Sequence, residues 1–151
     1  MKRSIVMVFV AVAALIMAAS VQAKEWETDF KRASSGAEKT SKYMLLYFSG
    51  SDWCTWCKKL DKEVFEKRSF KDYSRKNLVC VTLDFPEKKS QRKKLKKQNQ
   101  ALAEKYGVRG YPTVLILSPQ GNPVARTGYR AGGAKNYVEH LEGIISAHKE
   151  K

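Results

Sequence analysis

Two cysteines separated by two residues, Cys54 and Cys57, stand between an apolar run and a helical pattern. The run at 43–48 is Tyr-Met-Leu-Leu-Tyr-Phe, and its shortness and aromatic content favour a strand that is buried on both faces. The residues Ser-Gly-Ser-Asp at 49–52 then predict a loop, and the apolar spacing that follows predicts a helix over 58–67. The chain must therefore leave a buried strand and begin a helix within a few residues.

This position determines the expected chemistry of the cysteine pair. Cys54 is expected at the N-terminus of the helix, where free backbone N–H groups and the helix dipole favour the thiolate. The thiolate is the attacking species in thiol-disulfide exchange. Cys57 is expected one turn further along, within reach of Cys54. A C-x-x-C pair that follows a buried strand and opens a helix therefore predicts a redox-active disulfide.

The rest of the pattern predicts one α/β domain. Apolar residues spaced by four, three and four predict a helical stripe over 26–40, with Thr28 or Asp29 as its cap. Further apolar runs and helical stripes predict strands over 78–85, 113–117 and 123–127, and helices through 95–106 and 137–145. A β-α-β-α unit followed by a β-β-α unit gives a central mixed β-sheet flanked by helices on both faces.

The N-terminus has the three-part layout of a secretory signal peptide. Two cationic residues precede an apolar run at 5–19, and small residues within 20–23 predict cleavage after Ala23. The apolar run is shorter than the roughly 20 residues of a usual membrane span, although a short run can also remain as an uncleaved anchor. We therefore expect a signal peptide at 1–23 and an exported domain at 24–151, periplasmic or secreted.

Basic residues outnumber acidic ones by 29 to 15, and the formal net charge is +14. Seven of the basic residues form one run: Lys88, Lys89, Arg92, Lys93, Lys94, Lys96 and Lys97. Such a run commonly does no more than solvate a surface helix, and the alternative is weak binding to anionic surfaces such as lipid headgroups, polysaccharide or an acidic partner. Nucleic acid is not expected, because the signal-peptide pattern predicts export and no aromatic residue interleaves the run. We expect a monomer.

Two segments resemble the thioredoxin family. Residues 53–58, Trp-Cys-Thr-Trp-Cys-Lys, resemble its active-site motif, and residues 106–113, Tyr-Gly-Val-Arg-Gly-Tyr-Pro-Thr, resemble the segment that ends in a cis-proline. The approach Gly-Ser-Asp-Trp-Cys at 50–54 is similar to that of exported thioredoxin-like proteins. The resemblance spans 26–148 and implies a single thioredoxin-fold domain whose cis-proline loop faces a C-x-x-C at a helix N-terminus.

The resemblance also implies an activity. Cys54 would be the nucleophile and Cys57 the resolving thiol of an exported thiol-disulfide oxidoreductase acting through Cys54-Thr55-Trp56-Cys57. It would need no cofactor, because the Cys54–Cys57 disulfide is itself the redox-active group. Its partners would be disulfide-containing or thiol-containing proteins and an upstream redox donor that resets the pair.

Four further residues receive a substrate-binding role from the resemblance. Pro112 would be the cis residue, and the backbone of Tyr111 would pair with an extended substrate by strand addition. Trp53 and Trp56 would form an apolar rim for a disulfide-bearing chain. For Trp53, core packing is an equal alternative, whereas Trp56 is expected at the surface because it lies between the cysteines.

The sequence departs from the family in two respects. Thioredoxins carry a buried Asp in the strand before the motif, but the matching position here is Phe48 or Tyr47. Asp52 and Asp61 are near in sequence, but neither belongs to that strand. Deprotonation of Cys57 is therefore left to water or to Glu63 folded inward. The middle pair of the motif, Thr-Trp, matches neither reducing thioredoxins nor strong oxidants. The sequence therefore does not determine the reduction potential of the cysteine pair. On the resemblance, a reductase or isomerase is favoured over an oxidase.

Cys80 falls inside the strand expected at 78–85, where a free cysteine is most often a small buried hydrophobe. The alternatives are a second redox partner and a third metal ligand. His140 and His148 both fall on the last predicted helix, so no metal site is expected. Two other functions stay open for the chain: a thioredoxin-fold adaptor that uses a basic surface, and a soft-metal carrier that uses the C-x-x-C pair.

Overall fold

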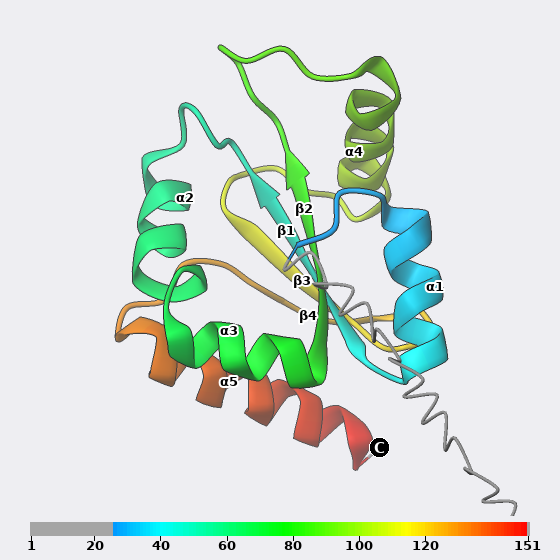
Figure 1. The fold of residues 1–151 in the computed structure, drawn as a ribbon, viewed down its shortest axis with the longest axis vertical. Coiled ribbons are helices and arrows are strands. Elements are labelled where there is room, and N and C mark those ends of the chain that lie inside the picture. The colour runs from blue at the N-terminus through cyan, green and yellow to red at the C-terminus, as the bar shows by residue number, and fades with distance from the viewer. Residues whose placement is uncertain (1–25, 151) are drawn as a thin grey trace, which may run out of the picture.

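The computed structural model describes residues 26–150, so the expected signal peptide at 1–23 lies outside the described residues. A four-stranded mixed sheet, in the order β2-β1-β3-β4, forms the centre, and helices cover both faces (Figure 1). This confirms the predicted α/β class. The elements follow the chain as α1 Phe30–Thr40, β1 Tyr43–Ser49, α2 Thr55–Leu60, the π-helical turn η1 Asp61–Phe65, α3 Arg68–Asn77, β2 Leu78–Asp84, α4 Lys93–Lys105, β3 Thr113–Leu117, β4 Pro123–Thr127 and α5 Gly133–Lys149.

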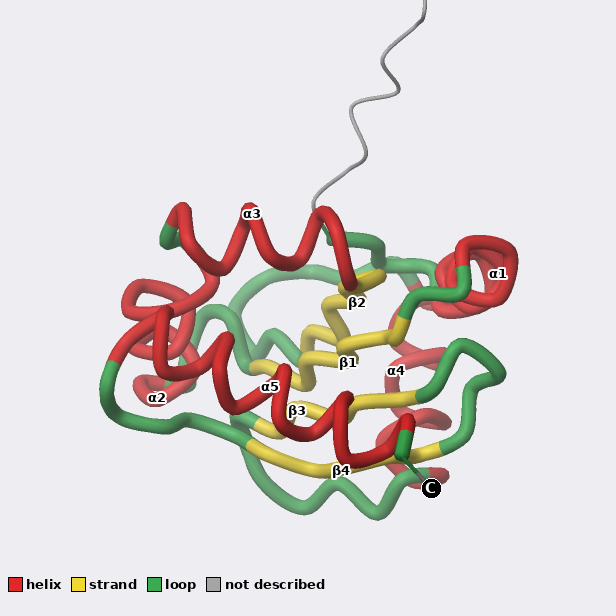
Figure 2. The backbone as a smooth tube through the Cα atoms, turned by 90° about the horizontal axis from the view of Figure 1, so that it is seen from below, coloured by secondary structure: helices red, strands yellow, loops and turns green. Residues whose placement is uncertain are grey.

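Strand β1 lies inside the sheet, between β2 and β3 (Figure 2). It pairs parallel with β2 and antiparallel with β3, and β3 pairs antiparallel with the edge strand β4. All seven residues of β1 are buried, which is why its sequence is continuously apolar rather than alternating. Within residues 26–150, no helix is long and apolar enough to cross a membrane.

The side chains of β1 alternate between two apolar layers. Met44, Leu46 and Phe48 belong to the layer that contains residues of α1 and α4. Leu45 and Tyr47 belong to the layer built from α2, η1, α3 and α5. Figure 1 shows α1 and α4 on one side of the sheet and the other helices on the opposite side. Since both motif cysteines belong to the second layer, the core itself positions the redox pair.

Helix α1 begins later than the apolar stripe suggested. Asp29, one of the two expected caps, is the N-cap, and its Oδ1 accepts the backbone N–H of Arg32 at 3.0 Å. Trp26, expected on the helical stripe, precedes this cap and packs in the opposite layer, 5.9 Å from Tyr47 between ring centroids. The backbone of Glu27 explains the difference, because it pairs with β2 and carries the chain past the sheet edge before the helix begins.

Three other boundaries differ from the predicted ones. Helix α2 begins at Thr55 rather than at residue 58, because Cys54 caps it. A separate helix, α3, follows η1 after Lys67 adopts an extended conformation, whereas the sequence pattern predicted one helix between β1 and β2. Helix α4 begins at Lys93, so the first half of the basic run at 88–97 is an irregular loop.

Candidate active site

Cys54 is the N-cap of α2, directly after the loop that leaves β1. Its Sγ accepts the backbone N–H of Cys57 at 3.1 Å, the capping bond that Ser or Asp makes in other helices. The two cysteines form a disulfide, and their Cα atoms lie 5.2 Å apart. Cys54 keeps 5% of its surface exposed and Cys57 none. In the reduced protein the same N–H group favours the thiolate of Cys54.

The loop before Cys54 is hydrogen-bonded to the segment that follows β2. The carboxylate oxygens of Asp52 accept the backbone N–H groups of Glu87, Lys88 and Lys89 at 3.0, 2.8 and 2.9 Å. These bonds, with that from Glu87 the strongest cause, hold the pKa of Asp52 below its ordinary value. The first part of the basic run is therefore fixed beside the cysteine motif.

Trp53 connects the same loop to the proline segment. Its indole Nε1–H donates to the backbone carbonyl of Phe85 at 2.8 Å, and its ring packs edge-on against Tyr111 at 5.6 Å between centroids. Tyr111 also packs against Phe85 at 5.2 Å, and the Tyr111–Pro112 peptide bond is cis. Trp53 is 37% exposed, so it lies at a surface rim and is not a core residue.

Trp56 belongs to a second aromatic cluster. It is 54% exposed, which confirms the surface position expected for it. Its ring lies 5.1 Å from Tyr129, and Lys59 Nζ lies 5.0 Å from the centroid of each ring. The hydroxyl of Tyr129 donates to Glu63 at 2.6 Å. Glu63 therefore belongs to this surface cluster and does not fold inward toward the cysteines, contrary to one sequence-based expectation.

The chain is similar to known proteins in sequence and in fold. Residues 30–142 match the family model of the thioredoxin-like domain. The chain belongs to the thioredoxin-like family. It is 32% identical over 130 residues to disulfide bond reductase DsbH of Chlamydia pneumoniae, covering 86% of this chain and 76% of that protein. It is also 30% identical to thioredoxin-related protein DsbJ of Chlamydia pneumoniae, but that match covers 68% of this chain and 30% of the relative.

Solved structures of thioredoxin-like proteins superpose on the chain. The structure of DsbH oxidoreductase matches with a TM-score of 0.77 at 31% identity, covering 80% of this chain and 83% of that one. A thioredoxin from Thermus thermophilus matches with a TM-score of 0.60 at 18% identity, over 80% of this chain and 85% of that one. The second likeness is one of fold alone. Together they confirm the thioredoxin fold predicted from the two motifs.

A polar pair, the buried Tyr47 and the half-buried Asp61, lies next to Cys57 in this thioredoxin-like domain. The hydroxyl of Tyr47, on β1, donates to the backbone carbonyl of Cys57 at 3.2 Å. Asp61, the first residue of η1, lies beside that hydroxyl. Burial raises the pKa of Asp61 to about 6, although its hydrogen bond with Tyr47 acts in the opposite direction. A pocket of about 350 Å³ opens next to the pair and is lined by both side chains.

Sequence reasoning missed two of these carboxylates. The sequence pattern gives Asp61 no role, because this residue does not belong to the strand before the motif. It lies four residues after Cys57, however, and hence on the same helical face. That spacing is the signal that identifies it. Asp52 left no such signal, because its partners are backbone N–H groups 35 to 37 positions away.

Cys80 and the histidines lie away from the motif. Cys80 pairs with Leu45 in the sheet register and is a buried free thiol. It is 5% exposed, which confirms the interpretation as a small buried hydrophobe. Burial also raises the pKa of the thiol to about 12. His148 shares a hydrogen bond of 2.9 Å with Tyr43. Among the described residues, no three side chains of His, Cys, Asp or Glu are grouped closely enough to hold a metal ion.

Proposed function

We propose that this protein is an exported disulfide reductase that transfers two electrons from its Cys54–Cys57 dithiol to disulfides of other proteins. The enzyme class, a thiol-disulfide oxidoreductase, follows from the thioredoxin-like family and the paired cysteines at the start of α2. The similarity to a protein named disulfide bond reductase supports the direction, and the signal-peptide pattern at 1–23 supports export.

One observation carries the proposal: the backbone N–H of Cys57 donates to the Sγ of Cys54. In the reduced protein, that bond stabilises the Cys54 thiolate, which attacks one sulfur of a substrate disulfide. A mixed disulfide forms and the first substrate thiolate leaves. The Cys57 thiolate then attacks the Sγ of Cys54, which releases the second substrate thiolate and forms the Cys54–Cys57 disulfide. The substrate thiolates take up two protons, and a dithiol donor protein must return two electrons to the pair.

The substrate would lie over the surface between the two aromatic clusters. Trp53 and Trp56 are the exposed large apolar residues of the described chain. Trp53 directly precedes Cys54, and Trp56 lies between the two cysteines. Tyr111 and Pro112 are half-buried and lie against Trp53 through the Tyr111 ring. Exposed aromatic faces beside a buried disulfide suit an unfolded or extended protein segment.

Reduction of insulin disulfides by the mature protein tests the activity. Cys54→Ser should abolish it, whereas Cys80→Ala, the matched control for removing a thiol, should leave it unchanged. Retained activity in the Cys54→Ser variant would contradict the proposed nucleophile. If partner binding instead survived loss of both motif cysteines with full function, the adaptor alternative would replace the proposal.

The reduction potential of the pair tests the direction of electron flow. With Cys80 changed to Ala, a reduction potential of about −270 mV would support a reductase, whereas one of about −120 mV would identify an oxidant. An intermediate potential of about −180 mV would favour an isomerase. For export, the N-terminal sequence of the protein from its own cell should begin at Lys24; a chain that keeps residues 1–23 would contradict cleavage.

A further inference from the structure

We propose that a basic cleft beside the cysteine motif binds an acidic segment of a protein partner and so brings that partner's cysteines to Cys54. The basic cleft is defined by Trp53, Phe85, Lys89, Lys96 and Tyr111. The inference rests on the proposed reductase function, because it names the class of protein on which the same cysteine pair acts.

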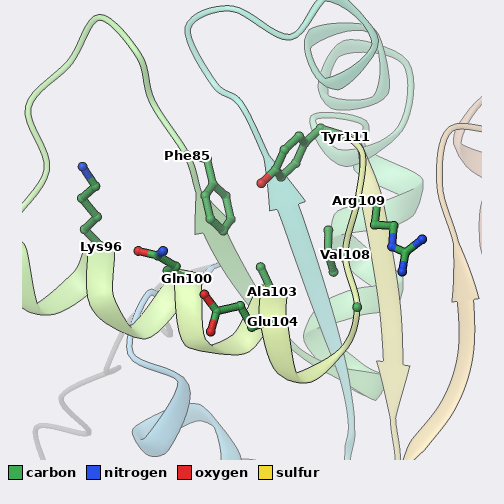
Figure 3. A pocket seen from close by; sticks show the side chains of 9 residues that line it. Phe85, Lys96, Gln100, Ala103, Glu104, Val108, Arg109 and Tyr111 are labelled. Atoms are coloured by element: carbon green, nitrogen blue, oxygen red, sulfur yellow. The ribbon is translucent and has the colours of Figure 1, made fainter.

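The basic cleft begins at the redox motif and leads away from it. A hollow of about 520 Å³ is lined by all five of its residues, and Trp53 directly precedes Cys54. A second hollow of about 480 Å³ shares three of them and continues between α4 and the loop before β3. Figure 3 shows Lys96 rising from α4, with Phe85 and Tyr111 on the facing side. The two hollows together provide an elongated surface rather than an isolated pit.

The basic cleft is held in place by bonds to the motif itself. Asp52 accepts three consecutive backbone N–H groups of the loop that carries Lys89, and Trp53 donates to the backbone carbonyl of Phe85. Asn99, buried on α4, donates to the carbonyl of Asp84 at 2.9 Å. The loop and α4 are thus fixed relative to the cysteines, so a partner bound there would meet Cys54 in one orientation.

The chain segment that borders the basic cleft is strongly basic. Residues 88–97 contain seven Lys or Arg and no Asp or Glu. Lys89 and Lys96 are exposed, and within the described residues neither forms a salt bridge. The lining of the two hollows contains three cations, Lys89, Lys96 and Arg109, and two carboxylates, Glu87 and Glu104. A surface of this charge accelerates encounter with an acidic partner and selects against basic ones.

The shape of the basic cleft favours a protein segment over a membrane. Its floor is formed by the rings of Phe85 and Tyr111, which pack together at 5.2 Å and offer contact to an apolar side chain of an extended segment. Headgroups of a flat bilayer would satisfy the lysines but would not enter an elongated hollow. The occupant we infer is therefore an acidic segment that carries at least one apolar residue next to its disulfide.

The test compares two synthetic peptides that contain the same intramolecular disulfide, one flanked by Glu and the other by Gln. The reduced enzyme should reduce the Glu-flanked peptide with a kcat/KM about tenfold higher at low salt, and salt at about 0.3 M should remove that advantage. K89E/K96E should lose the advantage and leave the Gln-flanked peptide unaffected. The matched control is K39E/K76E, which carries the same charge change on exposed residues just before β1 and β2, at the strand ends away from the motif.

The outcomes separate this inference from the proposed function. Equal rates for the two peptides with the wild type, or equal losses in both double variants, would overturn the basic cleft while leaving the reductase intact. The same holds if K89E/K96E abolished binding to vesicles of anionic lipid but left peptide kinetics unchanged. If neither peptide were reduced, and hydroxyethyl disulfide were not reduced either, the proposed function itself would fail and the inference with it.

Discussion

The carboxylate of Asp52 accepts the backbone N–H of Lys88 at 2.8 Å, across 36 positions of sequence. Two neighbouring N–H groups donate to the same carboxylate, so one side chain connects the redox loop to the basic run. Asp52→Ala removes the acceptor for all three groups. We expect faster amide hydrogen exchange at residues 87–89, because these N–H groups would be left to solvent.

The control for this prediction is Asp72→Ala. Asp72 lies on α3, where its carboxylate pairs with Arg68 and Arg75 at 3.4 Å, so its removal should not change exchange at residues 87–89. Unchanged protection in the Asp52→Ala protein would show that the loop after β2 is held by other contacts.

Gly50 leaves room for the indole of Trp53. A Cβ at this position would lie 2.7 Å from Trp53 Nε1, the atom that donates to Phe85. Gly50→Ala should therefore displace the indole and lower the free energy of unfolding by about 1–3 kcal/mol, the usual cost of overpacking. Urea unfolding measures the change. In a Trp53→Ala background the same substitution should cost little, and an equal cost there would assign the effect to the backbone instead.

The sequence predicted structure best where the conformation depends on residues that are adjacent in the chain. The apolar run of β1, the following loop and the position of Cys54 could be predicted because each depends on neighbouring residues. Helix α3 could not be predicted, since Phe70 is its one buried residue and only Tyr73 adds a partly buried apolar contact. Trp26 was misplaced because its helical spacing is coincidental, and pairing of Glu27 with β2 determines where the chain runs.

The candidate site shows the same division. The two cysteines and the Tyr111–Pro112 pair stand in motifs, so they could be named from the sequence. The surroundings of Cys57 depend on Tyr47 and Asp61, which come from different elements. Contacts to backbone N–H groups, such as those of Asp52, cannot be predicted from residue identities, because almost any residue type can supply the donor. They become visible only in the folded structure.

Cys80 should be chemically inert in the folded protein. Burial raises the pKa of its thiol from 9.0 to about 12, which lowers the thiolate fraction at neutral pH roughly a thousandfold. In reduced native protein, iodoacetamide should therefore label Cys54 first and Cys80 at least about a hundredfold more slowly. Mass spectrometry of timed samples measures this order. Labelling of Cys80 at the rate of Cys54 would restore the alternative of a second redox partner.

Asp61 should make the stability of the fold depend on pH in an unusual direction. Burial raises the pKa of its carboxyl from 3.8 to about 6, so the folded state binds the proton more tightly than the unfolded state. The contribution of Asp61 to stability is therefore complete below about pH 4 and is lost as the pH rises through about 6. Asp61→Asn, which stays neutral, should have a higher free energy of unfolding than the wild type at about pH 7. This difference should disappear at about pH 4. Urea unfolding of both proteins at the two pH values measures it, with Asp72→Asn as the exposed carboxylate that should show no gain. A pH-independent difference between the Asp61→Asn protein and the wild type would mean that the carboxyl of Asp61 ionises normally in the fold.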